Sequence, residues 1–200
     1  MKERFNLILS GVGGQGLITL GRLIGRACIL AGRNVTIAEV HGMSQRGGSV
    51  VVHVRIGEGE SPIIPSGAAH HIIAMEILEA GRTARYANKD TVMVVNDLIL
   101  PPPLVKYPSR EVVVESLRSK IGKFYLYNAE EVSKEITGSP ISSNIALLGF
   151  SLSVNPLFEE LIKKADIERA IEDMFKGKSA ELNKEILHRS YEAGRSRLGG

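Results

Sequence analysis

A glycine cluster near the start of the chain has the spacing of a phosphate-binding turn. Gly11, Gly13 and Gly16 fit the pattern G-x-G-x-x-G, with Gly14 and Gln15 between them. Glycine is needed where a chain turns tightly or where its backbone approaches a phosphate, and a helix that begins after the turn directs its amides and its positive dipole end at an anion. We therefore expect either a cofactor or phosphate site here, or close packing against another segment or subunit.

A second glycine-rich loop carries polar side chains of four kinds. Its candidate site residues are His41, Ser44, Gln45, Arg46, Gly47 and Gly48. An arginine beside two glycines can extend its planar guanidinium toward a phosphate or a carboxylate with little steric hindrance. We expect Arg46 to contact an anion, and the alternative is a polar loop with a solvated arginine.

Both loops follow segments with the pattern of buried strands. Residues 5–10 are apolar, residues 17–31 carry apolar side chains at helical spacing before Gly32, and residues 34–40 predict a second strand. This order predicts a β-α-β unit. Loops at the carboxyl ends of strands form the ligand crevice of open α/β sheets, so we expect the two glycine-rich loops to face one another.

Glu39 supports a competing interpretation. It lies about 20 residues after Gly16, where dinucleotide-binding domains carry an acid that binds ribose hydroxyls. Adenylating enzymes of the ubiquitin-activating type also carry a Gly-x-Gly-Gly-x-Gly turn, so a stand-alone nucleotide-binding or adenylating enzyme is the alternative. Against it, the chain has no paired Cys-x-x-Cys ligands, and we expect Cys28 to be buried in the first helix. A non-catalytic assembly module is a third hypothesis.

The remaining sequence alternates strand and helix patterns before turning helical. Strands are expected at 49–56, 70–75, 91–96 and 123–127, and helices at 76–86, 129–136, 144–152, 158–165, 167–175 and 180–195. Residues 101–108, which include three consecutive prolines, are expected to form an extended surface connection. The pattern predicts an α/β fold, a three-layer Rossmann-like sandwich with a largely parallel sheet and a helical C-terminal part. We expect residues 1–200 to form one domain.

Composition excludes several classes of protein. The chain has 200 residues, 44% of them hydrophobic, and a net charge of +3, which argues against intrinsic disorder and against a nucleic-acid partner. A single cysteine cannot form an internal disulfide or supply the four thiolates that an iron–sulfur cluster usually takes. No stretch approaches about 18 continuous apolar residues, so we expect no membrane association and a cytoplasmic location. We also expect no metal site.

Several segments together resemble one known family. They are Gly11 to Gly16, the run His41-Gly42-Met43-Ser44-Gln45-Arg46-Gly47-Gly48-Ser49-Val50, Pro62 to Pro65, Met75 to Ala80 and Asn144 to Gly149. With them the chain resembles the gamma-type catalytic domain of 2-oxoacid:ferredoxin oxidoreductases, and its second loop is most similar to that of the small (beta) subunits of the indolepyruvate type. The chain lacks the Tyr-Gly-Pro-Glu-like sequence that tends to precede Arg-Gly-Gly in relatives that act on pyruvate or 2-oxoglutarate.

The resemblance implies a subunit of a larger enzyme. It implies that a large partner subunit holds thiamine diphosphate and the iron–sulfur clusters, and that the complex oxidatively decarboxylates a 2-oxoacid with coenzyme A to an acyl-CoA and reduces ferredoxin. The chain alone is then expected to hold no cofactor, to have no complete catalytic set and to be inactive, with self-association as an option for the isolated subunit. The two glycine loops are expected to face the large subunit near thiamine diphosphate or coenzyme A. The family gives no reason to expect NAD.

Overall fold

The computed structural model describes residues 4–42, 47–59, 61–101 and 107–199. Its strands are β1 (Phe5–Val12), β2 (Val35–His41), β3 (Ser49–Ile56), β4 (His71–Ala74), β5 (Val92–Asn96) and β6 (Lys123–Tyr127). They form one sheet in the order β2-β3-β1-β4-β5-β6. The pairs β1–β4, β4–β5 and β5–β6 are parallel, whereas β3 is antiparallel to both β1 and β2. The predicted largely parallel sheet is confirmed, because only β3 runs against the other described strands.

The predicted β-α-β unit is present in split form, because β1 and β2 run parallel and are joined by α1, but β3 lies between them. Phe5 pairs with Ile56 and Val12 pairs with Ser49 along the whole of β1, which leaves β2 at the edge of the sheet. The physical reason is the length of the connection between β2 and β3. Only residues 42–48 separate these strands. A parallel crossover needs about a dozen residues or more, so this connection permits only an antiparallel neighbour.

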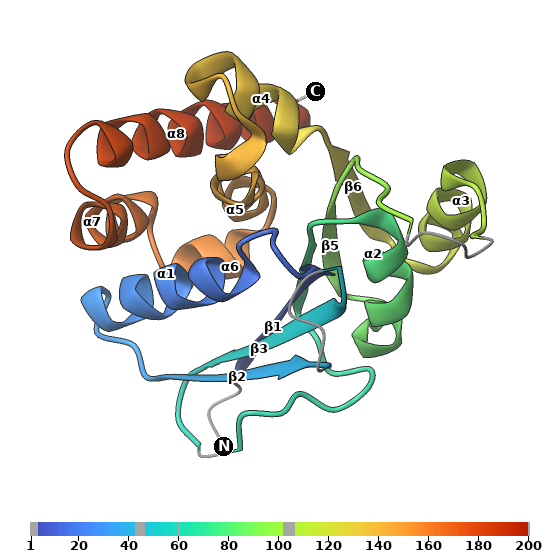
Figure 1. The fold of residues 1–200 in the computed structure, drawn as a ribbon. Coiled ribbons are helices and arrows are strands. Elements are labelled where there is room, and N and C mark those ends of the chain that lie inside the picture. Colours follow the sequence, from blue (N-terminus) through green and yellow to red (C-terminus); the bar gives the residue numbers. More distant parts are fainter. Residues whose placement is uncertain (1–3, 43–46, 60, 102–106, 200) are drawn as a thin grey trace.

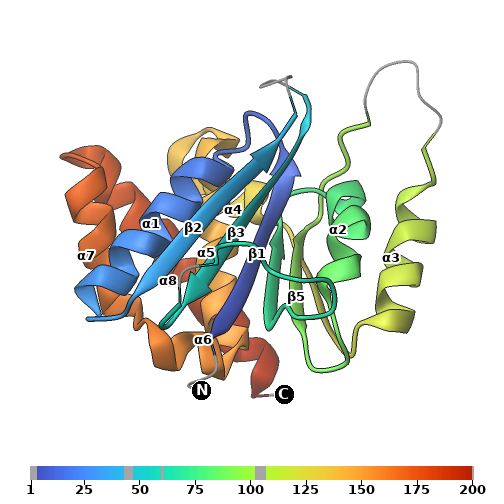
Figure 2. The same ribbon diagram turned by 90° about the horizontal axis from the view of Figure 1, so that it is seen from below.

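Helices cover both faces of the sheet and make three layers (Figure 1). One face carries α1 (Leu17–Leu30), α4 (Ala129–Thr137), α5 (Ser143–Val154), α6 (Pro156–Leu161), α7 (Lys164–Met174) and α8 (Lys178–Leu198). The other face carries α2 (Ile77–Thr83) and α3 (Arg110–Lys120). Two single helical turns complete the described elements: η1 (Ala84–Tyr86) follows α2, and η2 (Pro140–Ser142) lies between α4 and α5. In Figure 2 no helix crosses β2 and β3 on the face of α2 and α3.

Alternation along the strands divides the core between the two faces. Leu7 and Leu9 of β1 pack under α1 and the C-terminal helices, whereas Ile8 packs with the residues of α2 and α3. Helix α5 lies at the centre of the larger layer, and all of its residues are buried. A helix that is apolar on every side belongs in such a position.

Most predicted elements are confirmed within a few residues, and β6 matches its predicted bounds. The expected helix at 158–165 is divided between α6 and α7. Helix α3 was not predicted, because its consecutive β-branched residues Val112, Val113 and Val114 give no helical spacing. The extended connection expected at 101–108 falls largely on residues 102–106, outside the described residues. No described helix is long and apolar enough to cross a membrane.

Candidate functional site

The glycine turn at the carboxyl end of β1 needs glycine for both conformation and space. Gly14 and Gly16 have positive φ angles of 106° and 74°, which side chains disfavour. A Cβ atom on Gly11 would lie 2.9 Å from the Cβ atom of Met75, and one on Gly16 would lie 2.6 Å from Nδ2 of Asn144. The turn is therefore packed tightly against Met75 and Asn144.

Amide side chains attach this turn to its neighbours. Oε1 of Gln15 accepts a hydrogen bond from the Val12 amide at 2.7 Å, and its Nε2 donates to the Met75 carbonyl at 3.1 Å. Nδ2 of Asn144, at the start of α5, donates to the Gly16 carbonyl at 3.2 Å. Gln15, one of the predicted site residues, thus uses both of its polar atoms to hold the turn against the end of β4.

The two glycine-rich loops meet, as predicted. The Gly13 amide donates to the Gly48 carbonyl at 2.8 Å, and the Gly47 amide donates to the Gly13 carbonyl at 3.4 Å. The antiparallel register of β1 and β3 brings the two loops to the same edge of the sheet. The predicted site residues Ser44, Gln45 and Arg46 lie outside the described residues.

A hollow of about 350 Å³ opens between the loops and the start of α1. Its lining residues are Val12, Gly13, Gly14, Gly16, Leu17, Ile18, His41 and Val50. No side chain caps α1 at Gly16, and the first turn of α1 contains no acidic residue. Within α1 itself, no cap or first-turn acid thus neutralises the positive end of the helix dipole. The hollow combines a positive helix end with apolar walls, which suits a ligand that has both an anionic and an apolar part.

His41 lines this hollow and Glu39 does not. Both residues are exposed near the end of the edge strand β2, and Nδ1 of His41 lies 3.2 Å from the Gly42 carbonyl oxygen. Glu39 pairs with Val52 of β3, so a whole strand separates it from β1. The insertion of β3 therefore removes the βα geometry in which an acid after the second strand would reach a ribose at the glycine turn.

Two carboxylates at the start of α2 lie at the same end of the sheet as the glycine loops and were not predicted as site residues. Glu76 is 1% exposed and accepts hydrogen bonds from the amides of Glu79 and Leu100 at 2.8 and 3.0 Å. Glu79 is 6% exposed, accepts from the Ser49 hydroxyl at 2.5 Å and pairs with Nε of Arg82 at 3.3 Å. Burial raises the pKa of Glu79. In the sequence, two acids three residues apart at the start of a helix indicate an N-terminal cap, and this pattern could have drawn attention to Glu76 and Glu79.

Cys28 lies inside α1 and is fully buried, as predicted. Burial raises the pKa of its thiol to about 12, so the thiolate that would ligate a metal is strongly disfavoured. In the described parts of the chain, no group of three or more histidine, cysteine, aspartate or glutamate side chains is arranged to hold a metal ion.

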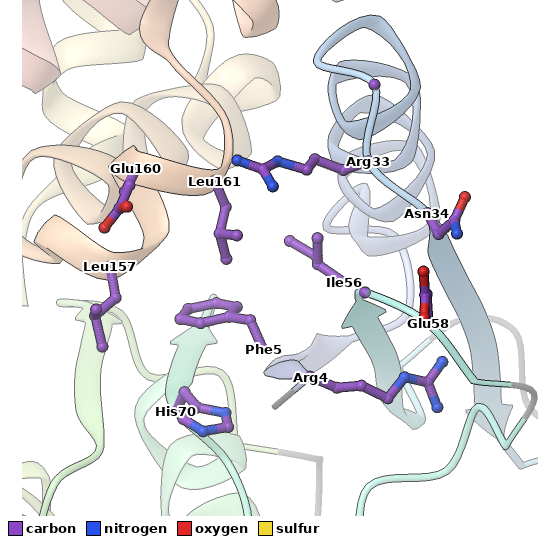
Figure 3. Close-up of a pocket in the computed structure, with 12 residues that line it drawn as sticks. Arg4, Phe5, Arg33, Asn34, Ile56, Glu58, His70, Leu157, Glu160 and Leu161 are labelled. Carbon is purple, nitrogen blue, oxygen red and sulfur yellow. The ribbon is translucent and has the colours of Figure 1, made fainter. Parts of the chain in front are cut away.

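Another hollow, of about 440 Å³, lies at the opposite end of the sheet (Figure 3). Phe5, Leu157 and Leu161 form apolar walls, and Arg33 extends across the opening toward α6. Arg4 points away from Arg33, and its guanidinium donates to the carbonyls of Gly59 and Ser61. None of the predicted site residues that the structure describes lines this hollow, so the glycine loops remain the candidate site.

Known relatives match the chain over nearly its whole length. The family described as pyruvate ferredoxin/flavodoxin oxidoreductase matches residues 6–193. Indolepyruvate oxidoreductase subunit IorB of Archaeoglobus fulgidus is 39% identical, with 94% of each chain covered, and that of Thermococcus kodakarensis is 34% identical over the full length of both. The common gamma subunit of the pyruvate/ketoisovalerate oxidoreductases of Pyrococcus furiosus is 28% identical, with 91% of this chain and 92% of the relative covered.

Solved structures show the same fold. Pyruvate oxidoreductase subunit PORC of Thermotoga maritima has a TM-score of 0.72 at 21% identity, with 96% of this chain and 97% of that chain covered. The 2-oxoglutarate:ferredoxin oxidoreductase of Magnetococcus marinus, solved with 2-oxoglutarate, coenzyme A and succinyl-CoA, matches with a TM-score of 0.72 at 17% identity. There the similarity covers 98% of this chain and 32% of that longer chain.

These findings do not support the alternative of a stand-alone nucleotide-binding or adenylating enzyme. The glycine turn that suggested it occurs here beside an antiparallel β3, with Glu39 on a distant edge strand. The family match covers both glycine loops, the sheet and most of α8. The chain belongs to the pyruvate ferredoxin/flavodoxin oxidoreductase family, whose members are subunits or domains of 2-oxoacid oxidoreductases.

Proposed function

We propose that this chain is the small subunit of an indolepyruvate-type 2-oxoacid:ferredoxin oxidoreductase. The observation that carries the proposal is the 39% identity to an indolepyruvate oxidoreductase subunit IorB with 94% of both chains covered. The complex would convert a 2-oxoacid and the thiol of coenzyme A into an acyl-CoA and carbon dioxide. Cleavage of the carbon–carbon bond leaves two electrons and one proton, and two ferredoxins each accept one electron.

The proposed division of labour assigns the cofactors to a large partner subunit. Thiamine diphosphate would supply the carbanion chemistry and the iron–sulfur clusters would carry the electrons, both held by that partner. Cys28, the single cysteine of the chain, is buried and holds its proton firmly, which suits a subunit without a cluster. The proposal includes a cytoplasmic location, ferredoxin as acceptor and one domain of residues 1–200.

The glycine loops are the proposed contribution of this chain to the shared site. The hollow beside α1 would receive an anionic part of coenzyme A or of thiamine diphosphate at the positive helix end. Arg46, which in the sequence directly precedes the Gly47 that donates to the Gly13 carbonyl, would contact the same anion. The exposed side chain of Ile18, at the mouth of the hollow, would pack against the large subunit.

The test is a reconstitution. The chain is co-expressed anaerobically with its large subunit, and reduction of a viologen dye is measured with indolepyruvate, pyruvate and 2-oxoglutarate, each with and without coenzyme A. The expected result is activity only in the complex, dependent on coenzyme A and highest with indolepyruvate. A preference for another acid would correct the substrate, and failure to form a complex would refute the subunit assignment.

A further inference from the structure

The buried carboxylate of Glu79 connects three parts of the chain that meet at the edge of the sheet. One oxygen accepts from the Ser49 hydroxyl at 2.5 Å, and the other lies 3.3 Å from Nε of Arg82. Nη2 of Arg82 in turn donates to the hydroxyl of Tyr107 at 3.2 Å. Through these contacts α2 holds the first residue of β3 and the segment that leads into α3.

Three neighbouring groups affect the charge of Glu79. Arg82 is its cationic neighbour, Glu76 is a second carboxylate at the start of the same helix, and Ser49 faces it from β3. A carboxylate that is 6% exposed keeps its charge only where such partners compensate for lost solvation. In the ionised form of Glu79 the hydrogen bond from Ser49 is charge-assisted, which makes it stronger than a bond between neutral groups.

Ser49 is the link from this carboxylate to the glycine turn. It pairs with Val12 at the end of β1, and its neighbour Gly48 accepts the hydrogen bond of the Gly13 amide. Gly47, one residue earlier, donates to the Gly13 carbonyl. Ser49 thus lies where the second loop rejoins the sheet, next to the hollow.

We propose that Glu79 is a positioning residue, which, through Ser49, holds residues 47–49 against the glycine turn in the arrangement that the complex needs to bind its anionic substrate or co-substrate. This inference rests on the proposed function. Glu79 touches no reacting atom in this scheme. Its role is to keep the two loops in register. Arg82 favours the charged form of the carboxylate, whereas the neighbouring Glu76 opposes it.

The experiment uses Ser49→Ala, Ser49→Thr and Glu79→Gln in the complete complex, with Glu115→Gln on the exposed surface of α3 as the matched control. Ser49→Ala removes the hydroxyl and leaves the Glu79–Arg82 pair, whereas threonine restores a hydroxyl and suits the start of a strand. Two quantities are measured for the wild-type protein and for each variant. The first is the hydrogen-exchange rate of the Gly13 amide, and the second is the pair of kcat and KM values for the 2-oxoacid and for coenzyme A.

The expected result for Ser49→Ala and Glu79→Gln is an exchange rate of the Gly13 amide and a KM that each rise about tenfold, with little change in kcat. Ser49→Thr and Glu115→Gln should match the wild-type protein. Unchanged exchange would overturn the proposal, as would faster exchange with an unchanged KM, which would mean a purely structural contact. If Glu79→Gln does not fold, Ser49→Ala and its threonine rescue decide. If the wild-type complex is inactive, the proposed function fails, and the exchange measurement still decides the link between Glu79 and the turn.

Discussion

The amide of Gly13 donates a 2.8 Å hydrogen bond to the carbonyl of Gly48, although 35 positions separate the two residues in the chain. This contact joins the turn after β1 to the loop before β3. It exists because β3 runs antiparallel to β1 along its whole length, so that the end of one strand lies beside the start of the other. The candidate site is therefore built from two backbone segments, and the following predictions test what holds them and what they bind.

Replacement of Arg46 should impair binding of an anion by the reconstituted complex. We expect Arg46→Ala to raise the KM for the 2-oxoacid or for coenzyme A roughly ten- to a hundredfold, since a lost charge-assisted hydrogen bond costs roughly 1.5–3 kcal/mol. Arg46→Lys should recover part of the loss, because lysine keeps the charge but not the planar fork. Arg118→Ala, on the exposed side of α3, is the control. Kinetics identical to wild type for Arg46→Ala would remove Arg46 from the proposed site.

A side chain at Gly16 should destabilise the glycine turn more than backbone strain alone explains. Gly16 and Gly32 have similar φ angles of 74° and 67°, but only at Gly16 would a Cβ atom meet a neighbour, Nδ2 of Asn144 at 2.6 Å. Each alanine substitution costs about 1 kcal/mol for the positive φ. We expect Gly16→Ala to lower the free energy of unfolding by roughly 1–2 kcal/mol more than Gly32→Ala in urea titrations. Equal losses would show that Asn144 moves aside freely.

The packing of α5 on α8 should depend on the absence of a side chain at residue 149. A Cβ atom on Gly149 would lie 2.4 Å from the carbonyl oxygen of Leu187, which belongs to the α8 backbone and cannot rotate away. We expect Gly149→Ala to cost roughly 2–3 kcal/mol of stability. Gly81→Ala in α2 is the matched control, since its Cβ atom would meet only Val113 at 3.5 Å. There the gain in helix propensity should leave stability unchanged or higher by about 0.5–1 kcal/mol. Thermal unfolding of both variants decides.

His71 should make the protein less stable as the pH falls. Burial lowers the pKa of this histidine from 6.5 to about 3, and a backbone hydrogen bond with Val92 offsets only part of that effect. Between these two pH values the unfolded chain binds a proton that the folded chain does not, so stability is highest above pH 6.5 and decreases on acidification toward pH 3. The slope from this residue approaches about 1.4 kcal/mol per pH unit.

Replacement of His71 by leucine should remove that contribution. In urea titrations at pH 7 and pH 5, the loss of stability on acidification should be smaller for His71→Leu than for the wild-type protein. His188→Leu, at an exposed position of α8, should leave the loss unchanged. A loss of the same size in His71→Leu and wild type would show that this histidine does not carry the effect.

Local sequence patterns determined most of the elements and the family. The β-branched run from Ser49 to Ile56 favours a strand by its own residue types, and the apolar residues of 17–31 have one helical face. The glycine spacing and the composition of the two loops were also local, so both the family and the meeting of the loops could be predicted. Prediction failed where local preference conflicts with tertiary packing. The three valines of α3 favour a strand, yet burial of Val114 and Leu117 against the sheet stabilises a helix.

Only the tertiary structure decided the neighbours of each element. The order of the strands places β3 between β1 and β2, which moves Glu39 away from the glycine turn. The partners of Gly16 and Ser49 come from α5 and α2, and no periodicity in the sequence marks such pairs. The physical reason is that periodicity reports which face of an element is buried, whereas pairing between distant segments depends on loop lengths and on which buried polar groups can satisfy one another.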